Sequence, residues 1–281
     1  SSPVTSLRVR ITMNRHVKTR HFGLLFVFAG LFLVAACTAD EGLPEYVERP
    51  VDEIYNDALS VLQEGDYKDA AIMFDEVERQ HPYSTWATKA QLMSAYSYYQ
   101  DDSYDSAVVA LDRFIQLHPS SPDVPYAYYL KALCYYEQIS DITRDQKMTE
   151  LAMLTLDELV KRFPSSKYAK DAKLKLDLTR DHLAGKEMEI GRYYLKQGQY
   201  LASLNRFKIV IDNYQSTTHV PEALHRLAES YVALGVTLEA QKVAAVLGHN
   251  FPGSEWYADA YGLVEGKIVK PKEDDPWYRL W

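Results

Sequence analysis

Small and apolar residues recur along this chain at spacings that predict helices. Five small residues begin the pattern, and each is followed by apolar residues four and seven positions later. The five are Ala70, Ala107, Ala152, Ser203 and Ala240. Positions i, i+4 and i+7 share one face of an α-helix, so each set predicts an amphipathic helix. Twelve residues after each small residue stands a proline, or Gln215 in the fourth set, and proline cannot continue a helix.

A second column of small residues precedes these predicted helices. Its members are Ala58, Ala95, Ala132, Gly191 and Ala228. Three positions after each stands Val61 in the first set and a tyrosine in the others. Small residues let two helices approach closely, and a ring beside them fills the remaining space. This order of positions matches the tetratricopeptide (TPR) pattern, so the sequence predicts an all-α fold, a right-handed superhelix of five TPR repeats.

The prolines and Gln215 set the repeat boundaries, with spacings of 37, 45, 51 and 37 residues between positions 82, 119, 164, 215 and 252. We expect repeats at 51–84, 85–121, 122–166, 167–217 and 218–254, with a closing helix to 265. The insertion of eight residues predicts a longer loop at Ile139–Gln146. The insertion of fourteen predicts one long helix from Lys167 to Lys196 that projects beyond the stack.

Residues 1–36 are predicted to be an export signal. A basic stretch from Arg15 to Arg20 precedes an uncharged run from Phe22 to Ala36. This run is shorter than the roughly 20 apolar residues of a membrane span, and it matches the apolar region of a signal peptide. Met13 is the expected start, with residues 1–12 an over-extended beginning. The alternative is an uncleaved anchor helix.

The small residues before Cys37 resemble a bacterial lipobox. The resemblance implies cleavage before Cys37 and attachment of lipid, including palmitate, to that residue, followed by a linker at 37–50. Several acyl chains hold a protein on a membrane better than one. Thr38 after the cysteine implies sorting to the outer membrane of a Gram-negative bacterium. At the other end, residues 266–281 are predicted to be a flexible tail that ends in aromatic residues, either disordered or an aromatic clip that docks on this chain or on a partner.

The charge of the chain is unevenly distributed. Residues 1–36 contain five Lys and Arg residues and no Asp or Glu. The other 26 of the 31 basic residues therefore stand against all 39 acidic ones, a net charge of −13 from residue 37 onward. Nucleic-acid binding depends on Lys and Arg contacts to phosphates, so we expect no nucleic-acid partner.

No motif predicts catalysis. The sequence has no Gly-rich phosphate loop, no G-x-S-x-G and no histidine pair at metal-binding spacing. Cys134 is the one cysteine after Cys37, which excludes a disulfide framework, and its apolar surroundings predict a buried, inert thiol. We therefore expect no enzyme activity, no metal site and no cofactor apart from the covalent lipid on Cys37.

The predicted groove of the superhelix is rich in tyrosine, a residue of which the chain has 22. In a TPR stack the first helix of each repeat lines the groove, and the positions flanking the second column are its lining. They are Tyr55, Leu59, Lys89, Tyr96, Tyr99, Tyr126, Tyr129 and Tyr136. Tyrosine offers a large contact area and a hydroxyl at low entropic cost, which favours an extended peptide with aromatic side chains. The alternative is that the same rings pack between repeats.

Three stretches of the chain resemble the BamD family, the lipoprotein subunits of the outer-membrane β-barrel assembly machinery. They are Asp112–Pro119 with Pro122, Thr179–Ala184 with Glu187 and Tyr193-Tyr194, and Asn205-Arg206. The first is similar to the second-repeat motif of the family, the second to its long fourth-repeat helix, and the third follows in the manner of the family. The resemblance covers the chain from Cys37 to about Phe251.

This resemblance implies partners. The C-terminal repeats are implied to hold the periplasmic POTRA region of the barrel protein BamA, with Arg180, Tyr194 and Arg206 as predicted contacts, beside other lipoproteins of the machinery. The N-terminal repeats are implied to receive the aromatic-ended C-terminal signals of unfolded outer-membrane proteins. The chain would be a scaffold on the periplasmic face of the outer membrane that raises the effective concentration of client near the barrel protein.

Two alternatives remain from the sequence. One is another periplasmic TPR lipoprotein scaffold, in cell-wall synthesis or division. The other is an enzyme with a TPR body, although the repeats leave little chain for a catalytic domain.

Overall fold

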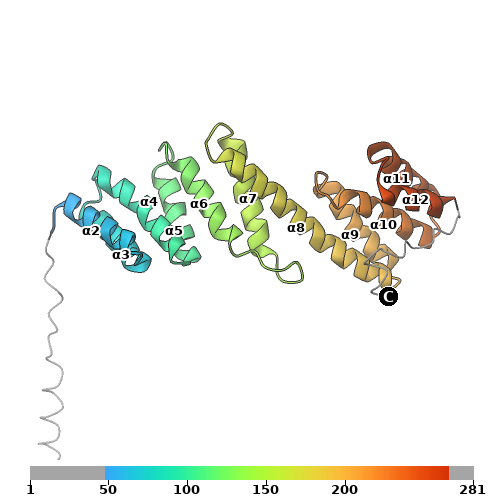
Figure 1. The fold of residues 1–281 in the computed structure, drawn as a ribbon, viewed down its shortest axis with the longest axis horizontal. Helices are drawn as coiled ribbons and strands as arrows, with labels where there is room; N and C mark the ends of the chain where they lie inside the picture. Colours follow the sequence, from blue (N-terminus) through green and yellow to red (C-terminus); the bar gives the residue numbers. More distant parts are fainter. Residues whose placement is uncertain (1–47, 266–281) are drawn as a thin grey trace, which may run out of the picture. The chain divides into compact units, whose positions relative to one another are not determined.

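The structure is a computed structural model that describes residues 48–265, and this part of the chain is helical without strands (Figure 1). The helices are α2 (Val51–Glu64), α3 (Tyr67–Gln80), α4 (Thr85–Gln100), α5 (Tyr104–Leu117), α6 (Val124–Tyr136), α7 (Lys147–Arg162), α8 (Ala169–Lys196), α9 (Tyr200–Asn213), α10 (Val220–Ala233), α11 (Thr237–Asn250) and α12 (Glu255–Val264). The all-α prediction is confirmed. The five pairs from α2 to α11 fit the five predicted repeats, and the handedness of the superhelix stays a prediction.

The predicted signal peptide, the lipidation site Cys37 and the tail at 266–281 lie outside the described residues. Within the described part, no helix is both long and apolar enough to cross a membrane.

Both columns of small residues are buried where helices meet. Ala58, Ala95, Ala132, Ala228, Ala70, Ala107, Ala152, Ser203 and Ala240 are all 0% exposed. The bulky residues four positions after Ala70, Ala107 and Ser203 are also 0% exposed. They are Phe74, Leu111 and Phe207. Burying one Leu or Phe side chain contributes about 1.5–3 kcal/mol, so the repeated pattern supplies the core of the protein.

Each helix packs against the next one in the chain, and first helices of neighbouring pairs also touch. Contacts of this second kind join α2 to α4, α4 to α6, α8 to α10, and α10 to the closing helix α12. The first helices therefore lie next to one another along the stack. The predicted groove residues belong to three of these helices, α2, α4 and α6.

Four turns within the pairs contain a residue with a positive φ angle. These residues are Gly65 (88°), Asp102 (57°), Gly198 (70°) and Gly235 (77°). A left-handed residue at the end of a helix reverses the chain in a short turn, and glycine adopts it without a clash of its side chain. The third pair is joined instead by residues 137–146, the longer loop that the insertion predicts.

The long helix α8 runs without interruption for 28 residues, as predicted, although it begins at Ala169. Its expected projection beyond the stack is wrong, because both of its halves are packed. Ala172 and Leu176 belong to a core shared with α4, α5, α6 and α7, whereas Ala184 and Met188 belong to a core shared with α9, α10, α11 and α12. Helix α8 therefore joins two hydrophobic cores.

Gly191 is required where α8 meets α9. A Cβ atom at this position would lie 2.5 Å from Cε1 of Phe207, which is itself 0% exposed. The two helices approach closely enough for the ring to rest on the glycine backbone.

Candidate binding surfaces

The eight predicted groove residues fall into two groups in the structure. Tyr55 and Leu59 in α2 and Lys89 early in α4 lie near the first core, which α2, α3 and α4 share. The other five lie in α4 and α6 and pack against the next core. Trp86, which the sequence pattern did not single out, also packs against the first core.

Tyr55 is a core residue in this structure. It is 8% exposed, and its ring centroid lies 5.4 Å from that of Phe74 and 4.8 Å from that of Trp86. Leu59 is half-buried against the same core. Lys89 is exposed, with its Nζ atom 5.5 Å from the centroid of the Trp86 ring. Of the first group, Lys89 therefore offers the most surface to a partner.

Four of the remaining tyrosines pack against one core together with a fifth that the sequence pattern did not single out. We call Tyr96, Tyr99, Tyr126, Tyr129 and Tyr168 the tyrosine cluster. All five are half-buried. The Tyr168 ring, just before α8, stacks on Tyr129 with centroids 5.1 Å apart, and the Tyr126 centroid lies 5.4 Å from it. Burial raises the pKa of Tyr126, and the nearby hydroxyls of Tyr96, Tyr168 and Tyr99 raise this pKa further.

Hydrogen bonds fix the orientation of two of these rings. The Tyr129 hydroxyl donates to Oδ2 of Asp171 over 2.6 Å. Burial, and then this bond, raise the pKa of Tyr129. Nε2 of Gln100 donates to the Tyr96 hydroxyl over 2.7 Å. Because these two hydroxyls are already hydrogen-bonded, the partly exposed faces of the Tyr96 and Tyr129 rings are the surface that they offer to a partner.

Tyr136, at the end of α6, lies beside α8 rather than in the tyrosine cluster. Nζ of Lys175 is 5.1 Å from the centroid of its ring and 3.5 Å from Oδ2 of Asp171. A hollow beyond Tyr136 is lined by Leu178 and His182 of α8. The first half of α8 therefore borders the aromatic surface of α6.

Tyr168, Asp171 and Lys175 escaped the sequence prediction for one reason. The fourth repeat was aligned on Gly191, which lies in the second half of α8. The fourteen-residue insertion precedes Gly191, so the part of α8 that faces α6 fell outside the selected positions. Counting thirteen residues from Pro164, the distance that separates Pro82 from Ala95 and Pro119 from Ala132, leads to Asp177 in the first half of α8.

The residues predicted to contact BamA lie along one stripe of α8 and on the adjacent α9. Arg180, Glu187 and Tyr194 are spaced seven residues apart, which is about two helical turns, so they share one side of α8. Arg180 Nη2 lies 3.0 Å from Oδ1 of Asp157 in α7. Arg206 Nη1 in α9 lies 3.0 Å from Oε2 of Glu187. The structure thus brings the three predicted residues to the same side of the molecule, with both arginines engaged in partly exposed ion pairs.

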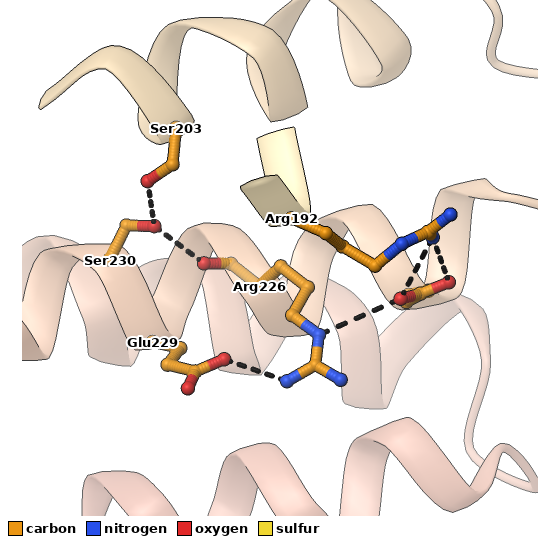
Figure 2. A network of polar contacts seen from close by, with 6 residues as sticks. Arg192, Ser203, Arg226, Glu229 and Ser230 are labelled. Atoms are coloured by element: carbon orange, nitrogen blue, oxygen red, sulfur yellow. Dashed lines mark hydrogen bonds and ion pairs between the residues drawn. The ribbon is translucent and has the colours of Figure 1, made fainter. Parts of the chain in front are cut away.

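A polar network ties the second half of α8 to α9 and α10 (Figure 2). Arg192 Nη1 donates to both carboxylate oxygens of Glu222 at 3.2 Å. Arg226, which is 2% exposed, lies between Glu222 and Glu229, with Nη1 donating to Glu229 over 2.8 Å. In the same network, the Oγ atoms of Ser203 and Ser230 are 3.0 Å apart.

The closing helix α12 covers this network with Trp256. The centroid of its indole lies 5.3 Å from the Arg226 guanidinium and 5.4 Å from the His225 ring. Burial, and then the charge of Arg226, lower the pKa of His225 to about 3. The network and the indole therefore hold α8 and α9 against α10 and α12.

The remaining sequence candidates for chemistry are inert or lie outside the described residues. Cys134 is 0% exposed, and burial raises its pKa to about 12, so its thiol is not a nucleophile at neutral pH. Among residues 48–265 there is no group of three or more His, Cys, Asp or Glu residues placed to hold a metal ion. Cys37 lies before the first described residue.

Residues 47–247 match the model of the YfiO family, which is described as "Outer membrane lipoprotein". The chain is 49% identical over 240 residues to the outer membrane protein assembly factor BamD of Caulobacter vibrioides, covering 85% of this chain and 79% of the relative. It is 49% identical over 216 residues to BamD of Rickettsia prowazekii, covering 77% of this chain and 86% of the relative. Among solved structures, the TPR domain of P58(IPK) matches with a TM-score of 0.38 and 16% identity, covering 76% of this chain and 56% of that one.

Proposed function

The chain belongs to the YfiO family of outer membrane lipoproteins, whose curated relatives are the assembly factors named BamD, and from this premise we propose that it is the scaffold and client receptor of an outer-membrane β-barrel assembly machinery. It binds its protein partners through two separate surfaces and performs no covalent step. A diacylglyceryl and acyl anchor on Cys37 holds it at the periplasmic face of the outer membrane.

The client surface is the tyrosine cluster with the adjoining face of α8. The observation that carries this proposal is the packing of five half-buried rings from α4, α6 and the turn before α8 against one core, with the Tyr168 ring in contact with Tyr126 and Tyr129. Two of their hydroxyls are already hydrogen-bonded, so the cluster presents ring faces at little cost in entropy. Such a surface favours the aromatic C-terminal signal of an unfolded outer-membrane protein.

The second surface is the stripe of Arg180, Glu187 and Tyr194 with Arg206, which we propose as the contact for the POTRA region of BamA. Its ion pairs are partly exposed, with 37% of the Arg206 side chain open to solvent, so they can exchange partners at modest cost. The polar network below supports this stripe from α10. Other lipoproteins of the machinery would bind elsewhere on the same scaffold.

Co-purification from detergent-solubilised membranes tests the assignment. The proposal predicts a barrel protein with POTRA domains among the partners identified by mass spectrometry. Recovery of cell-wall synthesis or division proteins in its place would favour the alternative scaffold and contradict the proposal.

A further inference from the structure

Helix α12 is placed like the first helix of a further pair. It begins at Glu255, three positions after Pro252, just as the first helix α4 begins three positions after Pro82. In each of the five earlier pairs, a second helix packs on the first. Among residues 48–265 no helix follows α12. Within this part of the chain, one side of α12 therefore lacks the cover that the other first helices receive.

Apolar residues stand on two sides of α12. Trp256 and Ala260 belong to the side that packs against the core of the C-terminal pairs. Tyr257, Tyr261 and Val264 have the spacing i, i+4 and i+7, so they share a second side. Tyr261 is 50% exposed, and the other two are half-buried. A helix with apolar residues on two sides is usually covered on both, so the second side indicates a further contact.

The second side of α12 forms one wall of a cavity of about 430 Å³, and α11 forms the other wall. We call it the end cavity. Its apolar lining is Ala244 and Ala245 of α11 with Tyr257, Tyr261 and Val264 of α12. The volume lies within the roughly 300–1,000 Å³ of ligand pockets, so the end cavity has room for an aromatic side chain.

The two walls of the end cavity are held close together. A Cβ atom at Gly248 of α11 would overlap the ring of Tyr257, so this ring rests on the glycine backbone. The centroid of the Tyr261 ring lies 6.2 Å from that of Tyr257. The cavity is therefore a feature of packed helices, with two aromatic rings already in position to contact a third.

The chain leaves α12 at the edge of the end cavity, because Val264 and Glu265 are themselves part of the lining. Residues 266–281 continue from this edge and include the sequence Trp277-Tyr278-Arg279-Leu280-Trp281. Trp277 comes twelve positions after Glu265, which is enough chain to turn back onto α12. Pro271 and Pro276 lie between them, and proline favours a turn over a second helix. So short a connection gives the segment an effective concentration of about millimolar at the cavity.

The chemistry of residues 277–281 matches that of the end cavity. Arg279 is the one charged residue of this segment, and Glu265 is the one charged residue of the lining. The opposite charges favour docking modestly, and the aromatic rings supply most of the contact area. Gln241, also on the lining, has an amide oxygen that can accept from an indole N–H.

We propose that residues 277–281 dock in the end cavity of the same chain, with a tryptophan ring against Tyr261 and Ala245 and with Arg279 near Glu265. The segment takes the place that a second helix occupies in the earlier pairs. The last unit of a repeat protein needs such a closure, because an open apolar end promotes association. This inference concerns the chain itself and is independent of the partners proposed above.

Disulfide trapping in the full chain tests the docking. Leu280→Cys is combined with Ala245→Cys on the lining, or with Val246→Cys as the matched control. Val246 is exposed on the same helix and lies outside the lining. Cys37 is replaced by serine in all variants, so the buried Cys134 is the one natural thiol left. The pair at 245 and 280 should cross-link within one chain at least about tenfold faster than the pair at 246 and 280.

Removing the rings should remove this difference. Adding Trp277→Ala and Trp281→Ala to the pair at 245 and 280 should slow its cross-linking to the rate of the control, and circular dichroism verifies that each variant is folded. Equal rates at 245 and 246, or an unchanged rate without the two tryptophans, would overturn the proposal. A cross-link between two chains in place of one within a chain would show that a second copy occupies the end cavity, and it would overturn the proposal as well.

Discussion

The hydroxyl of Tyr129 in α6 donates a hydrogen bond of 2.6 Å to Asp171 in α8, 42 residues further along the chain. Four positions after Asp171, Lys175 lies over the ring of Tyr136, which is seven positions after Tyr129. Two positions on one face of α8 therefore contact two tyrosines on one face of α6. The aromatic surface continues from the third repeat into the long helix, so the proposed client surface extends as a single unit across α4, α6 and α8.

Replacing Tyr96 and Tyr129 by alanine should weaken the binding of a Phe-ended client peptide by about tenfold or more, because tyrosines at the centre of an interface carry much of its binding energy. Anisotropy titration measures the effect. Tyr83→Ala is the control, since that ring is fully exposed at 101% and lies outside the cluster, and it should leave the affinity unchanged. Unchanged affinity in the double variant, with an intact helical spectrum, would rule out the tyrosine cluster as the client surface.

Gly191→Ala should lower the free energy of unfolding by about 1 kcal/mol. The new Cβ would lie 2.5 Å from the buried Phe207 ring, and overpacking of about 1–3 kcal/mol outweighs the roughly 1 kcal/mol that alanine gains over glycine in a helix. Urea unfolding gives the value. Gly253→Ala, where no atom lies within 4 Å of the added carbon, should stay within about 0.5 kcal/mol of the natural chain. Equal stabilities for the two variants would contradict the close approach of α8 and α9.

Arg206→Glu should abolish co-purification with BamA. The substitution also places two acids opposite each other, because Arg206 pairs with Glu187 within the chain. A second variant, Glu187→Arg with Arg206→Glu, restores the internal ion pair with reversed charges. If Arg206 contacts BamA directly, this double variant should fold normally and still fail to bind. Recovery of the complex by the double variant would show that the pair only supports the structure.

Stability should fall on mild acidification because of His225. Its pKa is lowered to about 3 in the folded chain, against about 6.5 in the unfolded chain. Well above pH 6.5 the ring is neutral in both states and contributes no pH dependence. As the pH falls below 6.5 towards 3, the unfolded chain binds a proton that the folded chain does not, so stability is lost, by about 1 kcal/mol between pH 7 and pH 5.5.

His225→Phe provides the comparison for this pH dependence, because Phe retains an aromatic contact with Trp256 and does not titrate. Urea unfolding of both proteins at pH 7 and pH 5.5 isolates the histidine from the carboxylates that both share. Identical losses of stability in the two proteins would contradict the assignment.

The repeated small and apolar columns predicted the fold well because they describe local packing that recurs in each pair. Ala107, Leu111 and Phe114 are buried as the spacing requires, and the long helix follows from the spacing between repeats. The packing of the first half of α8 against the preceding helices was not predicted. The spacing between repeats gives the length of a helix, but it does not say which helices the inserted residues pack against.

The candidate site was predicted less completely. Tyr96, Tyr99, Tyr126 and Tyr129 meet in one cluster, but Tyr55 lies in the core because Trp86 covers it, and Trp86 belongs to the next repeat. The ion pairs of Arg180 and Arg206 were also invisible in the sequence. Their partners lie 23 and 19 residues away on neighbouring helices, and no motif connects them.

The most direct test of the client receptor is photo-crosslinking in living cells, with a benzophenone amino acid in place of Tyr99 in the cluster or of the exposed Tyr83. We expect adducts between position 99 and the C-terminal segments of newly exported outer-membrane proteins, and none from position 83. Absence of such adducts at position 99, or equal adducts at both positions, would contradict the client receptor.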